Sequence, residues 1–136
     1  MSTHELEHLD YSKVPKFSLK DNIYEAKVIQ VYDGDTITAI FKFADKFFKW
    51  NCRLDGIDTP EMKSKNVNEK SRAIEARDFL REKILGKIVQ LYCKDFDKDG
   101  RLLVDVKYNE DLMNDLMIKE GFAKAYFGGT KEEWNL

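Results

Sequence analysis

The stretch FFKWNCRLDGIDTPE, residues 47–61, joins a strand pattern to a sharp turn. Residues 47–54 alternate between apolar and polar, which is typical of a strand, and the Asp-Gly and Thr-Pro pairs that follow are turn chemistry. Pro60 fixes its own φ and restricts the residue before it to extended backbone. We therefore expect Arg53 on the polar face of a strand, with Asp58 and Glu61 presented close by on the turn.

The length and composition favour a single globular domain. At 136 residues with 43% hydrophobic residues, the chain can bury one sizeable core. We expect residues 1–20 to form a flexible N-terminal arm and residues 21–136 to form the folded domain. The formal net charge of −2 argues against a protein that coats a polyanion. A nucleic-acid substrate would need a local basic patch or a bound cation.

Two further features bear on the compartment. No window reaches the roughly 18 apolar residues of a membrane span, and residues 1–20 lack the apolar core of a signal peptide. We therefore expect an intracellular protein with no membrane partner. Cys52 and Cys93 each share a strand face with apolar neighbours, so we interpret both as buried free thiols in preference to a disulfide.

Alternating and helical patterns predict the order of the elements. We expect strands at 23–32, 37–43, 47–54, 87–96 and 102–108, and helices at 71–85 and 111–120, the second beginning at Asn109 or Glu110. Residues 62–70 are interpreted as a mobile surface loop. Five strands with a helix between the third and fourth predict an α+β fold, mainly β: a five-stranded OB-type Greek-key barrel with two to three helices.

Two aspartates could meet at one rim of such a barrel. Asp35 begins a predicted strand and Asp58 follows another. Paired carboxylates repel unless a cation lies between them, and a hard divalent ion with oxygen ligands is the simplest solution. With no cysteine or histidine in either motif, Ca²⁺ or Mg²⁺ is favoured over zinc. The alternative is that both aspartates merely cap turns.

Two arginines and a glutamate suggest phosphodiester chemistry. Arg53 and Arg101 both lie at strand ends, where planar guanidinium groups could match phosphate oxygens. Glu61 could orient or deprotonate an attacking water molecule. The alternative is that Arg53 is a surface arginine paired with Asp55 or Glu61.

Two other candidate metal sites are weaker. DFDKDG, residues 95–100, matches the start of an EF-hand loop, but Val106 stands where a bidentate glutamate is required, and predicted strands flank the segment. His4 and His8 have the i,i+4 spacing of helical metal ligands, yet the sequence offers no evident third ligand.

Four motifs together resemble the signatures of the staphylococcal nuclease (thermonuclease) family: VYDGDT at 31–36, RLDGIDTPE at 53–61, DKDGR at 97–101 and GFAK at 121–124. The resemblance covers residues 23–127. It implies an OB barrel with helices and Ca²⁺-dependent hydrolysis of DNA and RNA that leaves 3′-phosphates. It further implies metal binding by Asp35, Asp58 and the Thr59 carbonyl, water activation by Glu61, and transition-state contacts from Arg53 and Arg101.

The resulting prediction is a Ca²⁺-dependent, sugar-nonspecific nuclease. It would act as a monomer on DNA and RNA, with single strands preferred. Substrate contacts are expected from Lys63, Lys65, Lys98 and Tyr126. The alternative function is a catalytically silent OB module that binds single-stranded nucleic acid or a protein partner.

Overall fold

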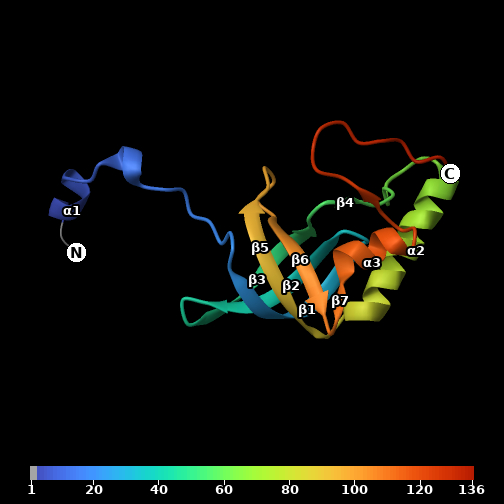
Figure 1. Cartoon of the computed structure of the whole chain (residues 1–136), viewed down its shortest axis with the longest axis horizontal. Coiled ribbons are helices and arrows are strands. Elements are labelled where there is room, and N and C mark those ends of the chain that lie inside the picture. The colour runs from blue at the N-terminus through green and yellow to red at the C-terminus, as the bar shows by residue number, and fades with distance from the viewer. Residues whose placement is uncertain (1–2) are drawn as a thin grey trace.

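A computed structural model describes residues 3–136, in which long strands form a barrel flanked by helices (Figure 1). The long strands are β1 (Ile23–Asp33), β2 (Thr36–Phe43), β3 (Lys46–Leu54), β5 (Ile88–Phe96) and β6 (Leu102–Tyr108). Three strands of two residues are β4 (Ile57–Asp58), β7 (Asp111–Leu112) and β8 (Lys124–Ala125). The helices are α1 (Thr3–Glu7), α2 (Val67–Ile84) and α3 (Met113–Lys119), with a 3₁₀ turn at Tyr11–Lys13.

The five long strands close on themselves. Their order is β3-β2-β1-β5-β6, and β3 also pairs with β6, from Cys52 opposite Leu102 to Leu54 opposite Val104. The β3–β6 pairing is parallel, whereas the other pairings among the long strands are antiparallel. Closure leaves no long unpaired edge within the barrel. The predicted five-stranded OB-type barrel, mainly β with helices, is confirmed.

The inward faces of the strands form the core, as their alternation predicts. Ile37, Ala39 and Phe41 of β2 are fully buried, and Phe41 stacks between Tyr24 and Trp50 at ring-centroid distances of 4.3 and 4.5 Å. Such stacked pairs add to the stability gained from burying apolar area. An aromatic cluster formed by β1, β2 and β3 therefore stabilises this side of the barrel core.

Both cysteines lie in this core as free thiols, which confirms their interpretation. Burial raises the pKa of Cys52 to about 12 and that of Cys93 to about 11. Since the thiolate is the reactive form, neither sulfur is suited to nucleophilic chemistry near neutral pH.

Helix α2 begins earlier than predicted. Asn66 caps it, because its side-chain oxygen accepts from the backbone N–H groups of Asn68 and Glu69 at 2.9 and 3.2 Å. The prediction of a loop through residue 70 is therefore wrong for residues 67–70. The apolar spacing did not reveal this first turn because it is largely solvent-exposed, with Val67 exposed by 79%.

Helix α3 begins later than predicted, and the proposed start at Asn109 or Glu110 is wrong. Asn109 adopts a positive φ of 55° in the turn after β6, and Asp111 and Leu112 pair with β6 as strand β7. Leu112 precedes the helix without a side-chain capping bond. Asp111 and Leu112, which the helical spacing predicted as part of the helix, therefore belong to a strand.

The N-terminal arm is tied to the barrel at its C-terminal end. Leu19 is buried in the core, and the Asp21 N–H donates to the Cys93 carbonyl at 2.9 Å. Figure 1 shows α1 set well apart from the barrel, on the side opposite α2. Within residues 3–136, none of the helices has the length and apolar character required to cross a bilayer.

Asn114 fastens α3 to the barrel. It is buried, and its side-chain oxygen accepts from the Val106 N–H at 2.9 Å. Its amide nitrogen donates to the carbonyls of Asp55 and Val104 at 2.8 and 3.1 Å. One side chain therefore joins β6, α3 and the turn after β3, which carries the residues of the predicted site.

Replacing Asn114 with alanine is expected to lower the free energy of unfolding by roughly 2–4 kcal/mol, since each buried polar group left unpaired costs about 1–3 kcal/mol. Urea denaturation measures the change. Asn51→Ala is a matched control, because the Asn51 side chain accepts an exposed hydrogen bond from the Thr38 hydroxyl. This substitution should alter stability by less than about 0.5 kcal/mol. Equal effects of the two substitutions would contradict the role of Asn114.

Candidate active site

The register of β2 against β3 brings Asp35 beside Arg53. Thr36 pairs with Arg53, and the Leu54 N–H donates to the Asp35 carbonyl at 2.8 Å. Arg53 Nη2 lies 3.4 Å from Asp35 Oδ2, and both side chains are only 11% exposed. Arg53 Nη1 also donates to the Leu54 carbonyl at 3.3 Å. The guanidinium is therefore held in a fixed orientation at the end of β3.

Asp58 and Thr59 approach the same place from β4. The Thr59 N–H donates to Asp35 Oδ2 at 3.4 Å, and both Asp58 and Thr59 are buried. Gly34 permits this close packing, because a Cβ at that position would lie 3.0 Å from Thr59 Cγ2 and 3.0 Å from Ala76 Cβ of α2. The three residues predicted as metal ligands thus lie together.

Negative charge is concentrated around these carboxylates. Asp33 Oδ1 accepts the Asp35 N–H at 3.1 Å, and burial together with the charge of Asp35 raises the pKa of Asp33 to about 7. Asp58 Oδ1 is buried and accepts no hydrogen bond from any residue between 3 and 136. A buried carboxylate oxygen without a hydrogen bond lowers the stability of the fold unless a cation pairs with it. The region is therefore built to attract positive charge.

Lys131 supplies one such charge from the C-terminal segment, which is drawn red in Figure 1 and loops out beyond the barrel. Its Nζ lies 3.1 Å from Asp58 Oδ1, at ion-pair distance though outside hydrogen-bond geometry, and 3.8 Å from Glu61 Oε1. Burial lowers the pKa of Lys131, but Asp58 more than offsets this effect, so the pKa lies above its ordinary value. Glu61 is thereby linked to Asp58 through one ammonium group.

A groove of about 490 Å³ adjoins the carboxylates, and we call it the arginine groove. It contains both predicted arginines, Arg53 and Arg101, together with Lys131. Its remaining lining residues are Asp55, Gly56, Asp97, Lys98, Asp99, Leu103, Tyr126, Phe127 and Gly128. Because Lys131 also contacts Asp58, the groove and the carboxylates form one continuous site.

Arg101 is oriented by the turn that precedes it. Its Nε donates to Asp97 Oδ2 at 2.8 Å, and its Nη2 lies 3.5 Å from Asp99 Oδ2. Asp97 Oδ1 also accepts the backbone N–H groups of Asp99 and Arg101, both at 2.9 Å. Residues 97–100, directly after β5, therefore form a turn that positions an arginine, which agrees with the rejection of an EF-hand.

The predicted substrate-contact residues divide into two groups. Lys98 and Tyr126 line the arginine groove, and Phe127 beside them is 88% exposed. Lys63 and Lys65 lie exposed on the segment between β4 and α2 and are not among the residues that line the groove. Only the first pair is brought next to the arginines.

Three contributors were missed from the sequence. Lys131 lies in a polar C-terminal stretch without periodicity, and Asn114 resembles an ordinary helical polar residue. Asp33 was not singled out as a contributor to the site. The signal for Asp33 was available, since it stands two residues before Asp35 in the same VYDGDT motif. Nothing local in the sequence marks the other two, because their partners are distant in the chain.

Comparison with known proteins agrees with this geometry. Residues 51–135 match the family described as "Staphylococcal nuclease homologue". The chain belongs to the staphylococcal nuclease family. The matched residues include Arg53, Asp58, Glu61 and Arg101, whereas Asp35 precedes them and lies beside them through its contacts with Arg53 and Thr59.

Curated relatives support the same family. The chain is 38% identical to a thermonuclease of Staphylococcus hyicus over 104 residues, 74% of this chain and 59% of that protein. It is 31% identical to a thermonuclease of Staphylococcus intermedius over 111 residues, 80% and 64% of the two chains. An uncharacterized endonuclease of Haemophilus influenzae is 36% identical over 100 residues, 74% and 51%. The chain thus spans between about half and two-thirds of the length of these relatives.

The family is metal-dependent, and the residues present fit a metal ion. Asp35, Asp58 and the Thr59 carbonyl offer only oxygen atoms, which suit a hard divalent cation. The buried Asp58 Oδ1, which accepts no hydrogen bond within residues 3–136 and has a lysine ammonium group 3.1 Å away, is the clearest sign of such a fit.

Proposed function

We propose that this protein is a Ca²⁺-dependent nuclease that hydrolyses phosphodiester bonds in both DNA and RNA. The observation that carries the proposal is the placement of Arg53, which contacts the carboxylate of Asp35 while lining the same groove as Arg101. Guanidinium groups beside an acidic cation site are suited to binding a phosphate group while a water molecule attacks its phosphorus atom. Family membership and the names of the thermonuclease relatives support this function.

Asp35, Asp58 and the Thr59 carbonyl would hold the calcium ion. A calcium ion bound there offsets negative charge on the phosphate oxygens. Arg53 and Arg101 would donate hydrogen bonds to the same phosphate, with Arg53 fixed by Asp35 and Arg101 fixed by Asp97. Donors fixed in advance stabilise developing charge without reorganising during the reaction.

Glu61 would take the proton of the attacking water. The water oxygen then bonds to phosphorus as the bond from phosphorus to the 5′-oxygen breaks. The departing 5′-oxygen takes a proton from solvent water, so one fragment ends in a 3′-phosphate and the other in a 5′-hydroxyl. Glu61 suits this role because its side chain is 65% exposed and yet faces the same ammonium group as Asp58. A water molecule can reach it from solvent.

Single strands are the favoured substrate in this proposal, and the protein would act as a monomer. Phe127 presents an exposed ring at the arginine groove, and Tyr126 lies next to it. Aromatic rings stack on unpaired bases regardless of sequence or sugar. Lys98 adds a positive charge within the groove, while Lys63 and Lys65 could contact the backbone farther along the strand.

The test uses four labelled substrates: single- and double-stranded DNA and RNA of one sequence. Pure protein is incubated with each in Ca²⁺, and the products are treated with a 3′-phosphatase before electrophoresis. We expect faster cleavage of the single strands and a mobility change on phosphatase treatment. Binding of single strands without cleavage in Ca²⁺ or Mg²⁺ would instead support the catalytically silent binding module.

Lys131 provides a prediction about the cation site. Lys131→Met removes the ammonium group from Asp58 and Glu61, so a divalent ion no longer competes with it. The affinity for Ca²⁺ should rise by up to about fivefold, since partly exposed ion pairs contribute up to about 1 kcal/mol. Titration calorimetry with CaCl₂ measures the change. The matched control is Lys119→Met at the exposed end of α3, which should leave the affinity unaltered; weaker Ca²⁺ binding by Lys131→Met would contradict the proposed competition.

A further inference from the structure

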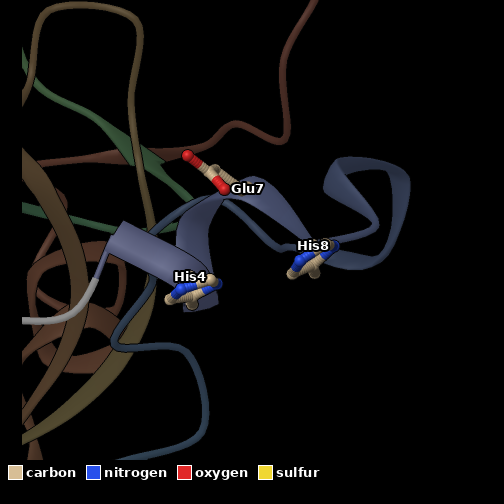
Figure 2. Close-up of side chains that lie close together, drawn as sticks. All are labelled: His4, Glu7 and His8. Atoms are coloured by element: carbon tan, nitrogen blue, oxygen red, sulfur yellow. The ribbon is translucent and has the colours of Figure 1, made fainter.

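Helix α1 and the residue that follows it place three side chains of metal-binding types on one helical turn. His4, Glu7 and His8 each offer one ligand atom, and all three atoms lie within 4.8 Å of one another. Figure 2 shows that the three side chains extend from one short segment, with His4 and Glu7 on α1 and His8 directly after it. Residues at i, i+3 and i+4 share a helical face. Glu7 thus supplies the third candidate ligand that was not evident from the spacing of the two histidines alone.

The two imidazole rings are stacked on each other. Their centroids are 6.2 Å apart and their planes differ by 15° (Figure 2). The His8 N–H donates to the His4 carbonyl at 3.3 Å, which closes the backbone turn that joins them. All three residues are exposed, so an ion can enter directly from solvent.

We propose that His4, Glu7 and His8 form a binding site for a borderline divalent metal ion, with Zn²⁺ as the best match. Imidazole nitrogen and carboxylate oxygen are the ligands that zinc takes in proteins, and three protein ligands leave a position for water. Calcium prefers sites built entirely from oxygen. This site therefore selects a different class of metal ion from the one that the barrel carboxylates would bind.

Metal binding should also stabilise the helix. α1 contains only five residues, and helices this short are unstable in isolation because nucleation is unfavourable. An ion that joins positions 4 and 8 fixes the one turn between them, so binding and folding of this turn are coupled. Because α1 lies apart from the barrel in Figure 1, this coupling is independent of the proposed nuclease activity.

The test is a calorimetric titration of ZnCl₂ into the full chain, with saturating CaCl₂ present to occupy the barrel carboxylates. We expect one equivalent of Zn²⁺ to bind the wild type. His8→Ala should weaken binding by at least about tenfold, since even outer-shell partners of metal ligands contribute that much. Glu5→Gln, on the same helix but outside the cluster, is the control and should bind as the wild type does. Amide hydrogen exchange at His8 should slow when Zn²⁺ is added.

Equal Zn²⁺ affinity in the wild type and His8→Ala would overturn the proposal, because the ion would then bind elsewhere. The absence of saturable binding in the wild type would also overturn it. So would Zn²⁺ binding that leaves exchange of the His8 amide unchanged.

Discussion

Arg53→Lys is expected to lower the rate of phosphodiester cleavage by about 10² or more, although the positive charge is kept. Lysine lacks the planar fork that can contact Asp35, the Leu54 carbonyl and a phosphate at once, and loss of one fixed donor to a transition state typically costs about 10²–10³ in rate. In the structure the guanidinium already uses Nη1 and Nη2 for the first two partners. Single-turnover cleavage of a labelled oligonucleotide measures the effect.

Arg77→Lys is the matched control for this substitution. Arg77 lies on α2 and pairs with its neighbour Asp78 at 3.1 Å, away from the arginine groove. Its replacement should leave the cleavage rate unchanged. If Arg53→Lys cleaved at the rate of Arg77→Lys, Arg53 would have no part in catalysis.

Glu61→Gln should lower kcat by about 10² or more while KM stays constant or falls. Glutamine keeps the size of the side chain but cannot accept a proton, and general base catalysis typically contributes about 10²–10⁴. KM can fall because a negative charge close to the phosphate is removed. Steady-state kinetics measure kcat and KM, and a melting curve on the same preparation measures the melting temperature.

The melting temperature separates the two interpretations of Glu61. Its ion pair with Lys131 spans 3.8 Å and is largely exposed, so its loss should cost less than about 1 kcal/mol. If Glu61 serves only as a partner of Lys131, the variant would melt slightly earlier with a normal kcat. That pattern would exclude the catalytic role.

Local patterns predicted the barrel well because buried residues alternate with more exposed ones over most of β2, β5 and β6. The inward residues Ile37, Ala39 and Phe41 lie on one face of β2, and a register slip by one residue would expose all of them. Boundaries set by capping were harder to predict. Asn66 begins α2 through two side-chain hydrogen bonds, and β7 exists only because β6 lies beside it.

Only part of the site could be predicted from the sequence. Asp35, Arg53 and Asp58 lie at strand ends, where the register brings them together, so their motifs could be recognised. Lys131 contacts Asp58 across 73 residues, and Asn114 reaches Asp55 across 59. Long-range contacts of this kind leave no periodic signal, because any polar residue in a turn or helix has the same local pattern.

The carboxylates of Asp35 and Asp58 suggest the most direct test of the central claim, that cleavage depends on a calcium ion held by this chain. A short 5′-labelled single-stranded DNA is cleaved by the wild type and by Asp58→Asn in Ca²⁺, after addition of chelator, and after Ca²⁺ is restored. We predict that the chelator stops wild-type cleavage, that restored Ca²⁺ recovers it, and that Asp58→Asn needs more Ca²⁺ for half-maximal rate. Wild-type cleavage that continues in chelator, or an Asp58→Asn variant with an unchanged Ca²⁺ requirement, would contradict the proposed site.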